Sequence, residues 1–215
     1  MGITANELIV LEKKGKDDFI TIVCSLPSQT NDRIYEFTIL ELINKTYPKM
    51  PSFKGIVLNR LKGEGLITLG IKNTLPGEPL KLEPLLRNND SLDYHVRGRV
   101  LPPLQVKSMQ RVLITLDGFW IHLIPKLIDN LKNANCEVAI SGPLTINALS
   151  FLRSTGANQI IPIDTFTALS QQILNSDADT IISLNTPLWQ KKVINLLWSH
   201  WLNKNLIIVN NQFLE

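Results

Sequence analysis

Small polar residues follow each of the apolar segments in the second half of the chain. Hydroxyl, carboxylate and amide groups in such places bind the polar parts of small molecules, and they also serve as helix N-caps and turn residues. If the apolar segments are parallel strands, their carboxyl ends meet at one edge of a sheet, where ligands bind in open α/β folds. We therefore predict a ligand-binding site made of seven residues: Asp117, Gly118, Ser141, Gly142, Asp164, Thr165 and Asn185.

These residues match no common catalytic, cofactor or metal motif. The glycines near Asp117 form neither a GxGxxG fingerprint nor a P-loop, which disfavours classical NAD, FAD and P-loop binding. A triad of Ser141, His122 and Asp117 would lack the GxSxG elbow of its usual fold. Asp117 and Asp164 are few acids for a Mg²⁺ site, and the two cysteines and three histidines have no zinc-ligand spacing. We predict no catalytic residue, no cofactor and no metal ion.

The segments that carry the predicted site alternate between strand and helix from Arg111 onward. Apolar segments of strand length are separated by segments with helical periodicity, which is typical of a parallel sheet covered on both faces. The predicted strands are 111–116, 137–140, 159–163, 180–184 and 206–209, and the predicted helices are 120–133, 145–154, 167–174 and 188–201. We therefore predict an α/β protein whose residues 111–215 form a three-layer, Rossmann-like domain.

The first half carries the whole positive excess of the chain. Residues 1–110 contain 15 Lys or Arg against 12 Asp or Glu, whereas residues 111–215 contain 7 of each. The excess is densest from Asn44 to Lys72. A local surplus of this kind attracts phosphate, although a solvated helix face has the same composition.

The pattern of the first half predicts a hairpin followed by two helices. Segments 7–11 and 19–26 are strand-like, with a polar turn between them. Apolar residues recur at helical spacing from Arg33, and again from Ser52 to Leu61, before a short strand at 66–69. Residues 1–72 are predicted as a small α+β domain and residues 73–110 as a proline-rich connector.

The two predicted helices and the run Leu61-Lys62-Gly63-Glu64-Gly65-Leu66-Ile67 resemble the end of a winged helix-turn-helix over residues 33–72. The resemblance implies DNA binding by the second helix. Lys54, Arg60 and Lys62 would then contact backbone phosphates, and Asn59 would read a base. A generic small α+β module is the alternative.

The helix from Trp189 to Trp201 carries more apolar surface than a small sheet needs, so it is predicted to mediate homo-oligomerisation. The first residues lack the features of a signal peptide, and no apolar run has the length of a membrane span. The chain is therefore expected in the cytoplasm, without a membrane partner.

The leading hypothesis is a DNA-associated regulator whose α/β domain acts as a sensor or dimerisation unit. One alternative is an enzyme that uses a small molecule or nucleotide at the strand ends. The other is a non-catalytic assembly or scaffold factor that acts through the tryptophan-rich helix.

Overall fold

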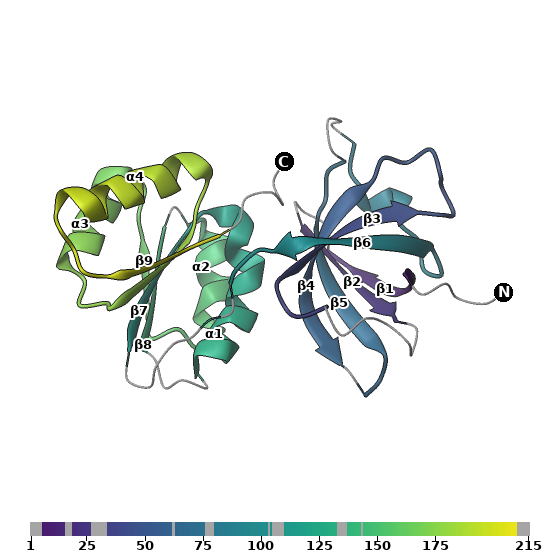
Figure 1. Ribbon diagram of the computed structural model, residues 1–215, viewed down its shortest axis with the longest axis horizontal. Coiled ribbons are helices and arrows are strands. Elements are labelled where there is room, and N and C mark those ends of the chain that lie inside the picture. The colour runs from purple at the N-terminus through teal and green to yellow at the C-terminus, as the bar shows by residue number, and fades with distance from the viewer. Residues whose placement is uncertain are drawn as a thin grey trace. The chain divides into compact units, whose positions relative to one another are not determined.

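The computed structural model describes residues 6–15, 19–26, 34–61, 63–75, 80–102, 104, 110–132, 137–142 and 144–209. The chain divides into two units between Val100 and Leu101, one built of strands and one of alternating strands and helices (Figure 1). No helix among the described residues is long and apolar enough to cross a lipid bilayer.

The first unit is a closed antiparallel barrel. Its strands are β1 (Glu7–Lys14), β2 (Phe19–Ser25), β3 (Thr38–Asn44), β4 (Phe53–Leu61), β5 (Leu66–Lys72) and β6 (Ser91–Arg99). They pair in the order β1-β2-β5-β4-β3-β6, and the pairing of β6 with β1 closes the barrel. Alternate residues of β1 and β2 point into a buried apolar cluster, which is the interior of the barrel.

The hairpin predicted at the start of the chain is confirmed, because β1 and β2 pair antiparallel. The two predicted helices are wrong. Residues 34–37 form a turn before β3, and the segment predicted as a recognition helix is β4, which pairs with both β3 and β5. The predicted winged helix over 33–72 is therefore part of a barrel.

The two helices were predicted wrongly because the apolar runs of β3 and β4 are short and fit helical and strand spacing equally well. The strand conformation is favoured by their β-branched residues and by hydrogen-bonded pairing with β5 and β6. Gly55 weakens a helix, but in β4 it accommodates Leu42, whose Cδ1 atom lies 3.1 Å from where a Cβ would stand.

Burial in the barrel makes Cys24 a reporter of barrel opening. Burial raises the pKa of the Cys24 thiol to about 12, so the reactive thiolate is almost absent at neutral pH. In a Cys136→Ser variant, where Cys24 is the only cysteine, we expect no reaction with a thiol reagent until urea unfolds the barrel. Prompt labelling without urea would show that β2 is not buried as described.

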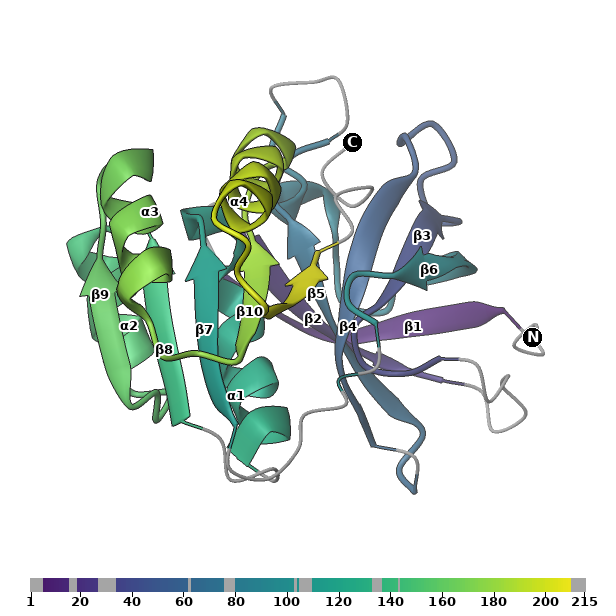
Figure 2. The ribbon, with the colours of Figure 1, turned by 60° about the vertical axis from the view of Figure 1, so that its left-hand side comes forward.

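The second unit is a parallel sheet between two pairs of helices (Figures 1 and 2). Its strands are β7 (Arg111–Leu116), β8 (Glu137–Gly142), β9 (Gln159–Pro162), β10 (Thr180–Leu184) and β11 (Asn205–Ile208), in the order β11-β10-β7-β8-β9. Its helices are α1 (Ile124–Lys132), α2 (Ile146–Arg153), α3 (Phe166–Asn175) and α4 (Pro187–Ser199), and the 3-10 helix η2 (Gly118–Leu123) precedes α1. Helices α3 and α4 cover one face and α1 and α2 the other (Figure 2).

The strands and helices predicted from Arg111 onward are present in the predicted order. Strands β7 and β10 have the predicted bounds, and the others differ by one or two residues at one or both ends. The predicted first helix is divided between η2 and α1. The fold class predicted for the whole chain was nevertheless wrong, because its first half is an antiparallel barrel.

Candidate functional site

The seven residues predicted at the strand ends all lie at the carboxyl edge of the parallel sheet. Asp117 and Gly118 follow β7, Ser141 and Gly142 end β8, and Asn185 follows β10. These three strands are neighbours in the sheet. The remaining two residues, Asp164 and Thr165, follow the edge strand β9 and are exposed.

The order of the strands reverses between β7 and β10. The chain runs from β7 through β8 to β9 on one side, and then returns to place β10 and β11 on the other side of β7. In open α/β sheets this reversal opens a crevice for a ligand beyond the strand ends. Asp117 and Asn185 flank it. The carboxylate of Asp117 accepts a hydrogen bond from the backbone N–H of Thr186 at 2.7 Å, which joins the two sides.

A row of buried hydroxyl groups lies beneath this crevice. Ser183, Thr115 and Ser141 are register partners across β10, β7 and β8. The Oδ1 atom of Asn185 accepts hydrogen bonds from Thr115 at 2.6 Å and from Ser183 at 3.0 Å. The side-chain NH₂ of Asn185 and the hydroxyl of Ser141 are also buried, and neither has a hydrogen-bond partner within the described part of the chain. A buried group without a partner costs about 1–3 kcal/mol. These two atoms therefore favour a polar ligand at the reversal of strand order between β7 and β10, the switch point of the sheet.

Helix α4 begins two residues after Asn185. This helix of 13 residues has Thr186 at its N-cap and Pro187 at its first position. The Thr186 side chain makes no capping hydrogen bond. Backbone N–H groups at such a helix start, together with the helix dipole, bind phosphate groups.

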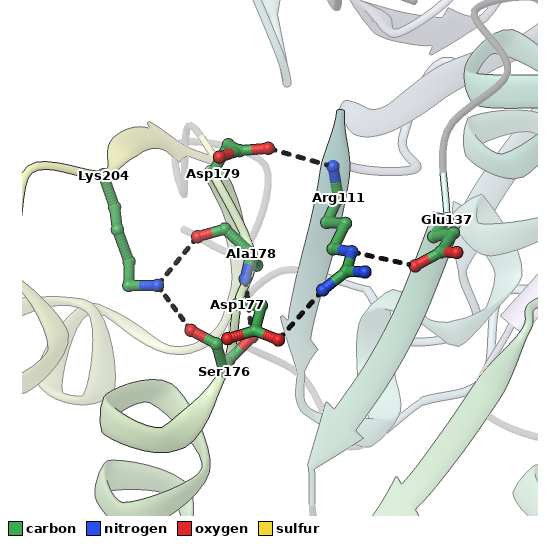
Figure 3. Close-up of polar contacts among 7 residues, drawn as sticks. All are labelled: Arg111, Glu137, Ser176, Asp177, Ala178, Asp179 and Lys204. Carbon is green, nitrogen blue, oxygen red and sulfur yellow. Dashed lines mark hydrogen bonds and ion pairs between the residues drawn. The ribbon is translucent and has the colours of Figure 1, made fainter. Parts of the chain in front are cut away.

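The opposite edge of the sheet is closed by an ionic cluster (Figure 3). The Arg111 guanidinium contacts Glu137 at 3.2 Å and Asp177 at 2.9 Å, and Lys204 donates to the carbonyls of Ser176 at 2.7 Å and Ala178 at 2.8 Å. These contacts tie the loop before β10 to β7, β8 and the start of β11. Because the Arg111 and Asp177 side chains are both exposed, the cluster fixes loop geometry more than it adds stability.

The barrel contains a second candidate site, which the sequence did not indicate. A cavity of about 300 Å³ opens between the β3–β4 connection and the β5–β6 connection. It is lined by Tyr47, Lys49, Met50, Pro51, Leu75, Leu80, Pro84, Leu85 and Arg87. The guanidinium of Arg87 lies 5.5 Å from the centre of the Tyr47 ring. An apolar wall, an aromatic ring and two cations suit a planar aromatic ligand that carries negative charge.

Buried polar contacts hold the two sides of this cavity together. The side-chain NH₂ of Asn44, at the end of β3, donates to the Asp90 carboxylate at 3.0 Å, and the same oxygen accepts the Arg87 backbone N–H at 3.0 Å. The side-chain Oδ1 atom of Asn44 accepts hydrogen bonds from the backbone N–H groups of Thr46 at 2.9 Å and Tyr47 at 3.2 Å. The pair of Asn44 and Asp90 therefore positions both Tyr47 and Arg87.

The short 3-10 helix η1 (Glu83–Leu85) is fixed in a similar way. Its first N–H group donates to the buried Asn73 side chain at 2.7 Å. The Lys13 ammonium donates to the carbonyls of Glu83 at 2.6 Å and Leu86 at 2.9 Å. The wall that carries Pro84 and Leu85 is thus preorganised, which lowers the entropy cost of binding.

The residues predicted to bind DNA do not lie on a helix in the described part of the chain. Lys54, Asn59 and Arg60 lie on β4, and Lys62 lies outside the described residues. Successive side chains of a strand point to opposite faces, so β4 does not present these residues as a recognition helix would. The Arg60 guanidinium donates to the carbonyl of Ile34 at 2.9 Å and so supports the turn before β3.

No protein-family model matches the chain, and no curated protein matches its sequence. Solved structures do match its fold. An NADH-dependent reduced ferredoxin-NADP oxidoreductase, described in a study of flavin-based electron bifurcation, superposes with a TM-score of 0.67 at 15% identity, over 97% of this chain and 77% of that chain. The siderophore-interacting protein from Acinetobacter baumannii has a TM-score of 0.66 at 10% identity, over 94% of this chain and 87% of that one.

Phthalate dioxygenase reductase, described as transferring electrons from pyridine nucleotides to a [2Fe-2S] centre, matches 93% of this chain and 66% of its own length, with a TM-score of 0.64 at 10% identity. These similarities, which span both units, contradict the predicted DNA-associated regulator with a winged helix. The chain has the ferredoxin-reductase-like fold, a six-stranded antiparallel barrel followed by a parallel α/β unit.

Proposed function

We propose that this chain is a flavin-dependent oxidoreductase that takes electrons from a reduced pyridine nucleotide. The observation that carries the proposal is the presence of two preorganised sites of suitable chemistry, one in each unit of a fold shared with flavin and pyridine-nucleotide reductases. Of the two alternatives to the DNA-associated regulator, this fold supports the enzyme with a site at the strand ends.

The barrel cavity is proposed to hold the flavin. Tyr47 offers an aromatic face, and Arg87 and Lys49 offer positive charge for the ring oxygens or the phosphate. A bound flavin would supply the acceptor for hydride and release the electrons onward. The residues of the chain would bind and orient it.

The switch point of the sheet is proposed to hold the nucleotide. The Asn185 NH₂ and the Ser141 hydroxyl would donate hydrogen bonds to its polar atoms, and the start of α4 would receive a phosphate. Asp117 would position this edge through its bond to Thr186 and is not proposed to react. The rim of this nucleotide site would be formed by the other four predicted residues, Gly118, Gly142, Asp164 and Thr165.

The flavin assignment is tested by adding FAD or FMN to the purified chain and removing the excess by gel filtration. We expect flavin absorbance to elute with the protein. An Arg87→Met variant should weaken flavin binding about tenfold, since the contact is worth about 1.4 kcal/mol. Lys81→Met, which changes an exposed cation of the same connection that does not line the cavity, is the matched control. A chain that retains neither flavin would contradict the proposal.

The nucleotide assignment is tested by bleaching of the bound flavin with NADH or NADPH under anaerobic conditions. Asn185→Leu should leave flavin binding unchanged but raise the nucleotide concentration needed for half-maximal bleaching about tenfold or more. If the variant bleaches like the wild type, the switch point is not the nucleotide site.

A further inference from the structure

The outer face of α4 ends in two exposed tryptophans. The side chains of Trp198 and Trp201 are 80% and 93% exposed, and Leu188 on the same helix is 63% exposed. Aromatic residues are enriched at protein interfaces, and a solvent-exposed cluster of them is rare on a monomer. A groove of about 470 Å³ runs beside both indoles and is also lined by Leu202.

Trp201 occupies a backbone position that favours glycine. It has a φ of 52°, in the left-handed region, directly after the C-cap residue His200. The N–H of Leu202 donates to the Leu197 carbonyl and that of Trp201 to the Trp198 carbonyl, which is the Schellman arrangement. An indole here adds strain, and at 93% exposure it contributes little packing within the chain. Its place is better explained by an interaction at the surface.

The charges of this face allow two copies of it to pair favourably in one relative orientation only. Between Asp179 and Glu215 the sequence contains no acidic residue. Lys191 and Trp198 are seven residues apart and therefore lie on the same stripe of α4, with Asn195 between them. Two copies in parallel would place Lys191 against Lys191. Two antiparallel copies would place each Lys191 on a Trp198 ring, a favourable cation–π contact.

We propose that α4 pairs antiparallel with α4 of a second copy of this chain, about a two-fold axis at Asn195. Each Trp198 then faces the partner's Lys191, and each Leu188 enters the groove beside the partner's Leu202 and Trp201. Indoles bury about 150–250 Å² each, so four of them approach the ~1,000 Å² at which specific interfaces begin. The axis makes the contact isologous and closed, which limits assembly to a dimer.

Sedimentation of the full chain over a range of concentrations tests the proposal. We expect a monomer–dimer equilibrium, and Trp198→Lys should raise the dimer dissociation constant at least about tenfold, because the introduced ammonium group would face the partner's Lys191. Adding Lys191→Glu to that variant should restore most of the affinity by exchanging the repulsion for an ion pair. A wild-type chain that stays monomeric would overturn the proposal, and so would a dimer in which the second change restores nothing.

Three further variants separate this dimer from other uses of the patch. In a Cys136→Ser background, Asn195→Cys should form a disulfide-linked dimer under mild oxidation, whereas Leu188→Cys, far from the axis, should not. Trp201→Gly should weaken the dimer while raising the melting temperature of the monomer, because it removes the left-handed strain. A monomer that instead sediments with anionic phospholipid vesicles, through the same tryptophans, would replace the second copy with a membrane surface.

Discussion

Gly142→Ala is expected to destabilise the parallel-sheet unit by about 3 kcal/mol or more, or to prevent its folding. A Cβ at this position would stand 1.8 Å from the Leu116 carbonyl oxygen and 3.0 Å from its carbonyl carbon. Both atoms belong to the backbone of β7, which pairs with β8 and β10. This strand cannot shift without breaking backbone hydrogen bonds to one of its neighbours. Glycine is therefore required where β8 passes the end of the central strand.

Urea unfolding followed by tryptophan fluorescence measures this effect, because all four tryptophans lie in the second unit. Ser141→Ala, one residue earlier on β8, is the matched control. It removes a buried hydroxyl that has no hydrogen-bond partner among the described residues, so stability should stay level or rise slightly. If both variants unfold at the same urea concentration, the close approach of β8 to Leu116 is wrong.

Asp90→Leu is expected to lower the stability of the barrel by about 3 kcal/mol and to weaken flavin binding without changing a residue that lines the cavity. The substitution removes the acceptor for the Asn44 side chain and the Arg87 backbone, and leaves two donors at a site where Asp90 is 3% exposed. Each donor loses its hydrogen bond and remains buried. Tyr47 and Arg87 then lose their common support.

The Cys24 labelling assay measures the stability of the barrel, and retention of FAD on gel filtration measures the binding. Asp90→Asn keeps one oxygen in nearly the same place and should recover most of both properties. The conservative variant separates loss of the hydrogen bonds from loss of charge. Unchanged labelling in Asp90→Leu would contradict a supporting role for this residue.

The second half of the fold is predictable from sequence because each of its elements is specified locally. The strands from β7 to β11 are continuous apolar runs, and the helices between them carry an apolar stripe. Parallel strands joined by helices also fix which ends meet, so Asp117, Ser141 and Asn185 could be placed at one edge in advance. Their hydrogen bonds could not, because the register that aligns Thr115 with its neighbours follows from packing.

The closed barrel could not be predicted in this way, because three of its six strand pairings, β2–β5, β3–β6 and β1–β6, join segments that are distant in the sequence. Strand β5 lies between β2 and β4, and β6 pairs with both β1 and β3. The segments that became β3 and β4 are too short for their spacing to distinguish helix from strand, so the closed sheet decided their form. The regular alternation of apolar and polar residues can be followed in the amino-acid sequence alone. Only tertiary structure brought Tyr47 against Arg87, forty residues later, because a barrel joins distant strands through contacts that no local pattern records.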